Sequence, residues 1–484
     1  MSIASVSSGP RSEMIVFLTS CVLLLSGSSS SLVTPKYDTI VVGLGSAGAS
    51  AASTLARAGR RVLALEGQDR VGGRVWTRSF GDGVVEAGAE WVHGQEHSRV
   101  YDLAMQNNLT MVVQDAPLKV LQSNGSSNQL FAYLVEYGLK VKEDGSEVNE
   151  PMGQFIERRL KEHLQTKNPE LLNDKDALDS LFDLMGRMVN NLEASNDWND
   201  VTALQGGYEQ LQGNQTTSWH RYGYNTFFDL LLNTFNNGSG LPTLDMKLNA
   251  EVTSIQWSDS GVVVTCADGA RYSADNVIVT VSLGVLKERH ASLFSPPLPK
   301  DKVNAIEVLT IGVVDKIILQ FPQRPTESFT LFSWSAADRR RVPGEDQWTT
   351  QLLGLSAPAG SSDTLTLWAM GETAKLVETL PEEVVRAKVY ELLKRFLGSD
   401  IPEPVAIIRT TWFSNPFTRG SYSFDNLEVP KHPGLRAALA APLVAGGAPC
   451  VLFAGEATDD RHYSTVHGAS DTGYREAERL LAAV

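Results

Sequence analysis

The first regular hydrophobic pattern is a short β-branched run that leads into glycines and then into an alanine-rich stretch. Residues 37–42 (YDTIVV) lie between a proline and a glycine, which predicts a buried strand. Residues 49–58 predict an alanine-rich helix that ends at Gly59, and residues 61–65 (RVLAL) predict a second strand. This order of strand, helix and strand is typical of an α/β fold.

Later segments of the chain carry similar patterns. Residues 248–255 (LNAEVTSI), 261–266 and 451–454 (VLFA) predict strands, and residues 473–481 predict a helix that a glycine begins. Residues 143–199 are charged and favour helices, and we expect them to cover a site.

The N-terminus carries a possible targeting signal. Residues 14–25 form a twelve-residue apolar run that small residues follow, and this length suits a signal peptide better than a membrane helix, which needs about 20 apolar residues. A leader without structure or a short membrane anchor is the alternative. We predict that residues 1–31 are a signal peptide and that the mature protein is secreted or lies in the lumen of the secretory pathway. Later segments are too short or too polar to predict a stable membrane span.

Composition adds modest constraints. The 484 residues are 42% hydrophobic and 20% charged, as in soluble globular proteins, and the length favours two or more domains. The net charge of −14 argues against binding to nucleic acid and would attract small cations, although solubility alone also favours an acidic surface.

Glycosylation and thiol chemistry remain open from the sequence. Asn-x-Ser/Thr sequons begin at Asn108, Asn124, Asn214 and Asn237. Beyond the leader only Cys266 and Cys450 remain, which cannot form a disulfide framework. We expect two buried free thiols, with one bridge as the alternative.

The glycines after the first strand predict a dinucleotide site. Gly43 permits a tight turn, Gly45 lets a pyrophosphate approach the backbone, and Gly48 lets helix and strand pack closely. Ser46 lies in the turn before the predicted helix, whose N-terminus would direct N–H groups and a positive dipole end at the phosphates. Glu66, at the end of the second strand, would accept hydrogen bonds from ribose hydroxyls. This unit of strand, glycine turn, helix and strand does not by itself distinguish an NAD site from an FAD site.

A second cluster near the C-terminus has the same character. After the strand at 451–454 come Gly455 and Glu456, then YSTVHGA at 463–469, then the predicted helix. Such a segment could bring another helix N-terminus to the cofactor, although it could equally be a structural strand, turn and helix.

Together these motifs resemble the flavin-containing amine oxidases, and most closely the polyamine oxidases, from about Tyr37 to the C-terminus. The motifs that carry the resemblance are GGR at 72–74, GAEW at 88–91, FAGEAT at 453–458, YSTVHGA at 463–469 and GYREA at 473–477. The resemblance implies a Rossmann-like FAD-binding domain interleaved with an α+β substrate-binding domain. It also implies non-covalent FAD, because no cysteine stands near Ser464 where monoamine oxidases attach the flavin.

The resemblance assigns the cofactor contacts residue by residue. Arg74 would reach the pyrophosphate, the Val252 backbone would meet the adenine, and Glu456 would accept from a ribityl hydroxyl. The other residues that it places beside the flavin are Gly88, Ala89, Glu90, Trp91, Trp412, Gly455, Thr465 and Val466.

The resemblance also implies the chemistry, in which a hydride equivalent leaves the carbon beside the substrate nitrogen and O2 reoxidises the flavin. The products would be an aminoaldehyde, a shorter amine and H2O2. Lys316 matches the lysine that holds a water against flavin N5 in this family. Taken alone, Lys316 could instead end a strand and extend to solvent.

Five residues are candidates for substrate contact. Tyr422 and Thr465 occupy the cage positions, and Ser464 would make the wall polar, as in spermine and acetylpolyamine oxidases. His93 could hydrogen-bond a substrate nitrogen. Glu209 is a looser match to an acid that contacts a distal amine. We predict no metal site, because His93 and His97 have i, i+4 spacing but lack the glutamate of the HExxH zinc pattern.

The resemblance predicts interleaved domains. Residues 36–110, 211–290 and 440–484 would form the FAD-binding domain, and residues 111–210 and 291–439 the substrate-binding domain. The predicted partners are spermine, spermidine or an acetylated polyamine and O2, with the oligomeric state open. Two alternatives remain: another amine or L-amino-acid oxidase, and a flavin-bearing binding protein without redox activity.

Overall fold

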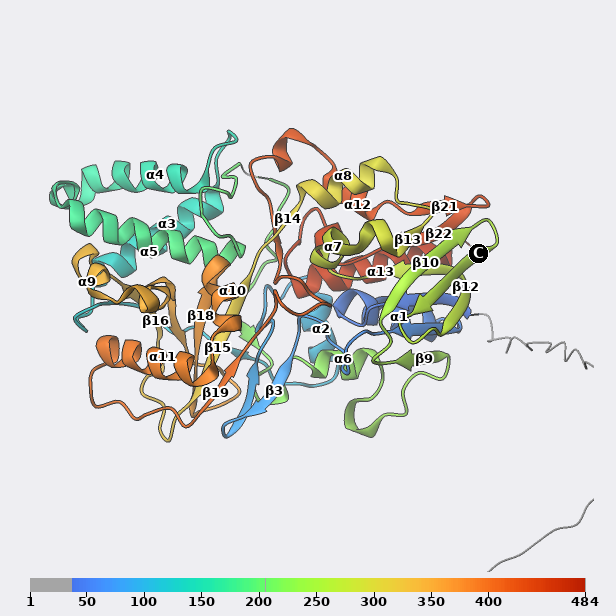
Figure 1. Cartoon of the computed structure of the whole chain (residues 1–484), viewed down its shortest axis with the longest axis horizontal. Helices are drawn as coiled ribbons and strands as arrows, with labels where there is room; N and C mark the ends of the chain where they lie inside the picture. Colours follow the sequence, from blue (N-terminus) through green and yellow to red (C-terminus); the bar gives the residue numbers. More distant parts are fainter. Residues whose placement is uncertain (1–36, 205, 484) are drawn as a thin grey trace, which may run out of the picture. The chain divides into compact units, whose positions relative to one another are not determined.

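Strand β1 (Tyr37–Val42) lies at the centre of a large sheet, between β2 (Val62–Leu65) and β12 (Arg271–Val279), and runs parallel to both. The predicted strands at 37–42 and 61–65 are therefore confirmed. This computed structural model describes residues 37–204 and 206–483, which belong to one compact unit. The predicted signal peptide at 1–31 lies outside the described residues (Figure 1).

The sheet has nine strands in the order β13-β10-β11-β12-β1-β2-β9, with β22 beside β12 and β21 beside β22. The strands not yet given are β9 (Leu244–Lys247), β10 (Val252–Ser258), β11 (Gly261–Cys266), β13 (Phe294–Ser295), β21 (Leu443–Ala445) and β22 (Ala448–Phe453). The strand predicted at 248–255 begins later, at Val252. Cys266 and Cys450 on this sheet are buried and free, so the alternative of one bridge is wrong.

Helices α1 (Ser46–Arg57) and α13 (Val466–Ala482) pack against each other beside this sheet. The helix predicted to begin at Gly473 instead begins at Val466. Gly473 lies inside the helix, where a Cβ atom would stand 2.1 Å from the carbonyl oxygen of Ala47. A glycine is therefore needed at position 473 for close contact between the two helices, and it does not mark the start of a helix.

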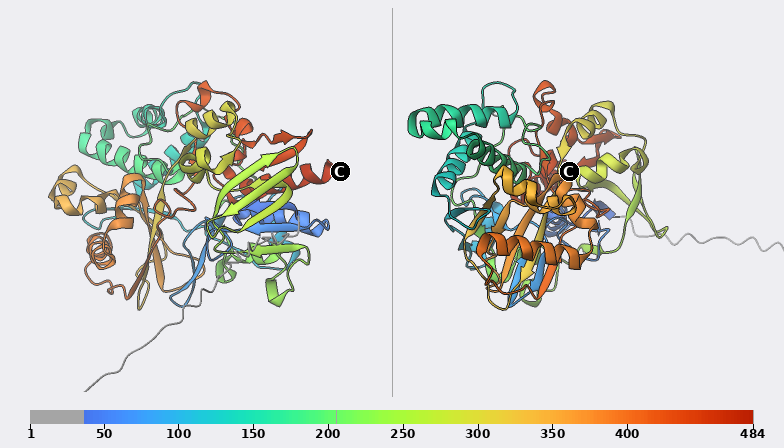
Figure 2. Two further views of the ribbon diagram at one scale, coloured as in Figure 1. Left: turned by 45° about the vertical axis from the view of Figure 1, so that its right-hand side comes forward. Right: turned by 60° about the vertical axis from the view of Figure 1, so that its left-hand side comes forward.

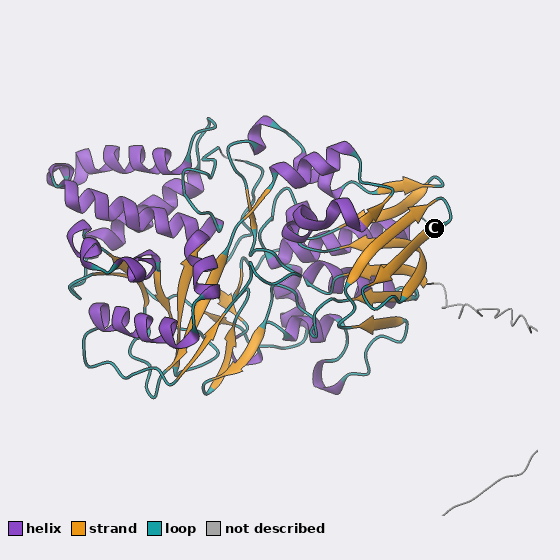
Figure 3. Cartoon of the chain, in the orientation of Figure 1, coloured by secondary structure: helices purple, strands orange, loops and turns teal. Residues whose placement is uncertain are grey.

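A second, six-stranded sheet has the order β19-β15-β18-β17-β16-β7. Its strands are β7 (Leu118–Gln122), β15 (Val314–Gln320), β16 (Phe329–Ser333), β17 (Gly354–Ser356), β18 (Thr364–Met370) and β19 (Ala406–Arg409). Figure 3 shows the strands gathered in these two groups. The first sheet draws on residues 37–65, 244–295 and 443–453, and the second on residues 118–122 and 314–409.

Three helices, α3 (Gln129–Asp144), α4 (Met152–Lys167) and α5 (Lys175–Glu193), lie together near one end of the second sheet (Figure 2). The helix-prone character of residues 143–199 is thus confirmed. The apolar sides of these helices form one core with residues of the sheet such as Val314.

Eight further α-helices and seven further strands lie in the described part of the chain. The remaining helices are α2 (Arg99–Gln106), α6 (Thr226–Leu231), α7 (Leu283–Leu293), α8 (Lys300–Val308), α9 (Ala336–Arg341), α10 (Gly371–Thr379), α11 (Glu382–Leu397) and α12 (Leu435–Ala440). The remaining strands are β3 (Thr77–Phe80), β4 (Gly83–Glu86), β5 (Trp91–Val92), β6 (Val112–Val113), β8 (Thr217–Ser218), β14 (Thr310–Ile311) and β20 (Ser423–Phe424). Within the described ranges, none of the helices combines the length and apolar character that crossing a membrane requires.

Candidate active site

A cavity of about 1270 Å³ is lined by residues of both sheets and by the loops that follow their strands. It collects nearly all the residues singled out from the sequence: Gly43, Gly45, Ser46, Glu66, Arg74, Gly88, Ala89, Glu90, Trp91, His93, Val252, Lys316, Trp412, Tyr422, Gly455, Glu456, Ser464, Thr465 and Val466. Gly48 lies behind this wall, where a Cβ atom would stand 1.9 Å from the carbonyl oxygen of Gly43.

Glu209 is not brought to the cavity. Its side chain is exposed and its carboxylate forms an ion pair of 3.2 Å with Arg461. The predicted contact between Glu209 and a substrate amine therefore has no support in this arrangement.

The turn between β1 and α1 forms one end of the cavity. Gly45 is the N-cap of α1 and offers no side chain to the free N–H groups of the first turn, so these groups remain available for an anion. Buried Glu66 ends β2, and its carboxylate accepts hydrogen bonds from Leu44 N at 2.7 Å and Gln68 N at 2.9 Å. This end of the cavity fits the pyrophosphate and ribose of a dinucleotide.

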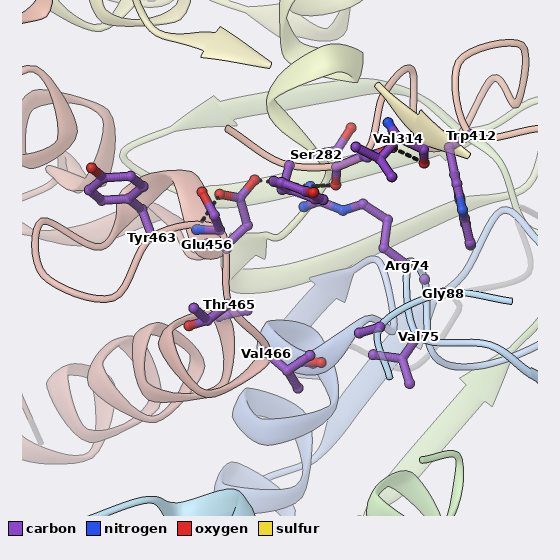
Figure 4. A pocket seen from close by; sticks show the side chains of 18 of the residues that line it. Arg74, Val75, Gly88, Ser282, Val314, Trp412, Glu456, Tyr463, Thr465 and Val466 are labelled. Atoms are coloured by element: carbon purple, nitrogen blue, oxygen red, sulfur yellow. Dashed lines mark hydrogen bonds and ion pairs between the residues drawn. The ribbon is translucent and has the colours of Figure 1, made fainter. Parts of the chain in front are cut away.

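The second cofactor cluster meets the first on the same wall. Arg74 Nη1 donates to Glu456 Oε1 at 2.9 Å, and Ser423 Oγ donates to Glu456 Oε2 at 2.6 Å. Burial alone would raise the pKa of Glu456, but the positive charge of Arg74 and these hydrogen bonds bring it below its ordinary value. Figure 4 shows both side chains among those that line the cavity.

Gly455 leaves the wall beside Glu456 open. A Cβ atom at Gly455 would have no heavy atom within 4 Å, which leaves room for a bound group to approach the backbone. Thr465 is the N-cap of α13: its Oγ1 accepts from Gly468 N at 3.0 Å and donates to the carbonyl oxygen of His462 at 2.6 Å. Ser464 Oγ donates to the carbonyl oxygen of Ser423.

Lys316 is buried on β15, with 4% of its surface exposed, so the alternative that it extends to solvent is wrong. Its Nζ donates to Glu90 Oε2 at 2.7 Å and to the backbone oxygen of Glu86 at 2.9 Å. The ring of Trp368, its cross-strand partner, lies 4.6 Å from Nζ. The cavity wall thus contains a buried ammonium group.

His93 follows β5 and has a defined hydrogen-bonding pattern. Its Nδ1 lies 2.7 Å from the backbone oxygen of Gln215, a carbonyl that can only accept, so Nδ1 carries a proton. Desolvation lowers the pKa of His93, which favours a neutral ring whose Nε2 keeps a lone pair. His97 is exposed and outside any helix, and the described residues contain no cluster of three or more metal-ligating side chains.

Aromatic side chains also line the cavity, among them Trp412 and Tyr422. Trp412 is buried, with its backbone N donating to Asp315 Oδ1 at 3.2 Å. Tyr422 Oη donates to the backbone oxygen of Asn191 at 2.5 Å, and burial raises the pKa of Tyr422. The hydroxyl contact orients the Tyr422 ring, and the Trp412 ring packs edge-on against Trp76, with ring centroids 6.3 Å apart.

An acidic group that the sequence did not single out also lines the cavity. Glu193, the last residue of α5, pairs with Lys142 at 2.5 Å. Burial, followed by the charge of Glu193, raises the pKa of Tyr208 to about 12. No motif surrounds Glu193 in the sequence. Its position on the cavity wall depends on how α5 packs in the folded chain.

Carboxyl groups outnumber cations on the cavity wall, and each cation is already paired. The acids are Glu66, Glu90, Glu143, Glu193, Glu251, Glu327, Asp425 and Glu456. The four cations pair with four of them: Arg74 with Glu456, Lys142 with Glu193, Arg289 with Glu251, and Lys316 with Glu90. Two of the other acids pair with arginines outside the wall, Glu327 with Arg324 and Asp425 with Arg436. Glu66 and Glu143 provide the remaining negative charge, which favours a cationic ligand.

Proteins similar to this chain include flavin-containing amine oxidoreductases. Residues 46–481 match the family described as flavin containing amine oxidoreductase. The chain is 32% identical over 496 aligned positions to the human peroxisomal N(1)-acetyl-spermine/spermidine oxidase, covering 92% of this chain and 94% of that protein. It is 27% identical to the Arabidopsis thaliana probable polyamine oxidase 5, covering 92% and 98% of the two chains.

A solved structure shows the same fold. A putrescine oxidase variant superimposes with a TM-score of 0.67 over 92% of this chain and 99% of its own, at 20% identity. The chain therefore belongs to the flavin-containing amine oxidoreductase family and is an FAD-dependent amine oxidase.

Proposed function

We propose that this amine oxidase acts on polyamines, namely spermine, spermidine or their N-acetyl derivatives, with O2 as the electron acceptor. The products would be an aminoaldehyde, a shorter amine and H2O2. The observation that carries the proposal is the surplus of carboxyl groups on a cavity that also contains the FAD residues. The relatives named for acetylated spermine, spermidine and polyamines support the same substrate class.

The residues on the wall fit FAD. The residues that would hold the pyrophosphate, ribose and ribityl groups are those of the α1 N-terminus, Glu66, Arg74 and Glu456. Bound FAD supplies the two-electron acceptor that amine oxidation needs. The protein supplies orientation, charge and exclusion of water.

A polyamine carries several ammonium groups, and the wall offers matching acceptors. Glu193 lies beside Tyr208 and Tyr422, whose rings can pack against methylene and ammonium groups. The Nε2 atom of neutral His93 can accept a hydrogen bond from a substrate N–H group, or it can take up a proton from the substrate. A deprotonated nitrogen is needed before its neighbouring carbon can release a hydride.

An L-amino-acid oxidase is less consistent with this wall. Its substrate carboxylate needs a cation, yet the eight carboxyl groups on the wall outnumber the four cations and would repel it. A binding protein without redox activity is also disfavoured, because it would have no use for a buried lysine beside the FAD residues.

The test is anaerobic spectroscopy of the purified holoenzyme. Spermine, spermidine, N1-acetylspermine, a monoamine and an L-amino acid would be added separately, and air admitted afterwards. We expect the polyamines alone to bleach the flavin band and to yield H2O2 on reoxidation. Bleaching by the L-amino acid or the monoamine, and by no polyamine, would reject the proposed substrate class.

We further propose that the protein enters the secretory pathway and is glycosylated. The apolar run at 14–25 supports a signal peptide. The sequon residues Asn108, Asn124 and Asn237 are exposed, and Asn214 is partly exposed, so glycan attachment would meet little steric hindrance at three of them. Expression in a secreting cell, with N-terminal sequencing and glycosidase treatment of the medium, tests this. Retention of an unprocessed, unglycosylated chain inside the cell would contradict it.

A further inference from the structure

Glu90 and Lys316 form an ion pair on the cavity wall. They are 226 residues apart in the chain, yet Lys316 Nζ lies 2.7 Å from Glu90 Oε2. Both side chains are almost fully buried: 5% of the Lys316 side chain and 4% of the Glu90 side chain are exposed. Two charges leave water at a substantial cost, which close pairing offsets only when the geometry is good.

The same ammonium group joins both ends of a short loop. Lys316 Nζ contacts the backbone oxygen of Glu86, where β4 ends, and the side chain of Glu90, just before β5 begins. The other side of the loop packs on the chain at Arg74, where Ala89 N donates to the Arg74 oxygen at 3.1 Å. A Cβ atom at Gly88 would stand 2.0 Å from that oxygen, so the loop has little room to move.

Glu90 is the carboxylate that directly balances Lys316. The other nearby acid, Glu86, uses its side chain elsewhere: its Oε1 accepts from Tyr224 N at 2.8 Å and its Oε2 from Thr77 Oγ1 at 2.9 Å. Burial raises the pKa of Glu86 to about 7. The Trp368 ring adds a favourable contact with the ammonium but no full charge.

The second oxygen of Glu90 strengthens this interpretation. Oε1 is buried and has no hydrogen-bond partner among the described residues. A buried carboxylate oxygen without a donor is costly, so the Lys316 ammonium is the group that offsets the charge of Glu90.

We propose that Glu90 is a positioning residue whose carboxylate balances the charge of the Lys316 ammonium and fixes it on the cavity wall during flavin reduction and reoxidation. The working unit is therefore the Lys316–Glu90 pair and not the lysine alone. This inference rests on FAD-dependent amine oxidation, and it does not depend on which polyamine is the substrate.

The test compares Glu90→Gln, Lys316→Met and the double variant with the parent holoenzyme. Rates of anaerobic flavin reduction and of reoxidation by O2 would be measured from about pH 6 to about pH 10, together with the visible spectrum of the oxidised flavin. We expect Glu90→Gln to slow at least one half-reaction about tenfold, equivalent to about 1.4 kcal/mol. It should also introduce one new ionisation into the rate and the spectrum, because the buried ammonium has lost its counter-ion.

The double variant and a conservative variant separate positioning from packing. In the Lys316→Met background, Glu90→Gln should change the rates by less than about twofold and add no ionisation. Glu90→Asp should keep the parent pH profile, even if the rates fall. Glu428→Gln, which removes an exposed ion pair with Lys431, is the matched control and should change neither property.

Three outcomes would overturn the proposal. One is an unchanged pH profile in Glu90→Gln, and another is an equal effect of that change with and without Lys316. Glu90→Gln could also lose FAD or fail to fold. In that case the double variant should recover FAD binding, because it buries no unpaired charge. A double variant that still fails to bind FAD would be the third outcome. The spectral titration needs no substrate, so it distinguishes failure of this proposal from failure of the proposed polyamine specificity.

Discussion

Arg74 and Glu456, 382 residues apart in the chain, meet at 2.9 Å on the cavity wall. The contact joins the loop after β2 to the loop after β22, so the FAD site is completed only when the two ends of the chain come together. Arg74 Nη1 also donates to the backbone oxygen of Ser421 at 2.7 Å, which ties in the segment that carries Trp412 and Tyr422.

Arg74→Ala should weaken FAD binding by about tenfold or more, because it leaves the buried Glu456 carboxylate without its main counter-charge. The ratio of flavin to protein absorbance after extended dialysis measures this. Arg99→Ala, which removes an exposed arginine outside the cavity, is the control. Equal flavin retention in both variants would contradict the role of Arg74.

Lys316→Met should keep bound FAD but slow flavin reduction or reoxidation. The substitution removes the charge with little change in volume, and the FAD residues around the α1 N-terminus are untouched. Stopped-flow measurement of both half-reactions checks the result. Unchanged rates in both would remove Lys316 from the mechanism.

Glu193→Gln should raise KM for spermine about tenfold, with a smaller effect on kcat, because a charge-assisted contact to the distal amine is lost. Glu209→Gln is the matched control, since the Glu209 side chain is exposed and is not part of the cavity lining. Steady-state kinetics of both variants measure the difference. A larger KM effect in Glu209→Gln would restore the contact predicted from the sequence.

His467 should make the protein less stable in acid. Burial, with smaller effects from His462 and His93, lowers the pKa of His467 from 6.5 to about 3. Between these two pKa values His467 is protonated in the unfolded chain but neutral in the folded chain. Its contribution to the free energy of unfolding is therefore fully present above about pH 6.5 and is lost as the pH falls toward 3. Between pH 7 and pH 5 the loss should be about 1 to 2 kcal/mol, and smaller in His467→Asn, as denaturant unfolding would show.

Gly473→Ala should destabilise the contact between α13 and α1 by about 1 to 3 kcal/mol, because the added Cβ overlaps the Ala47 carbonyl oxygen. Gly344→Ala, at a site with no heavy atom within 4 Å of the added Cβ, should be nearly neutral. Thermal unfolding of the two variants makes the comparison. Equal midpoints would show that α13 can shift without cost.

The sequence by itself determined the unit from residues 37 to 66. Strand, glycine turn, helix, strand and acid are consecutive there, and each is set by local backbone preference and hydrophobic pattern. The motifs at the two ends also indicated FAD, and the likeness to known amine oxidases agrees. The role of Gly473 was misread because a glycine needed for close helix packing has the same local appearance as one that begins a helix.

Only the tertiary structure decided which distant groups share the cavity. It paired Lys316 with Glu90, brought Glu193 to the wall with Lys142, and left Glu209 on the surface. These contacts depend on how the two sheets and helices α3 to α5 pack, which is determined by burial of apolar surface over the whole chain. A local pattern records which residues can form a strand or a helix, and it contains no information about the charge that will face a given side chain after folding.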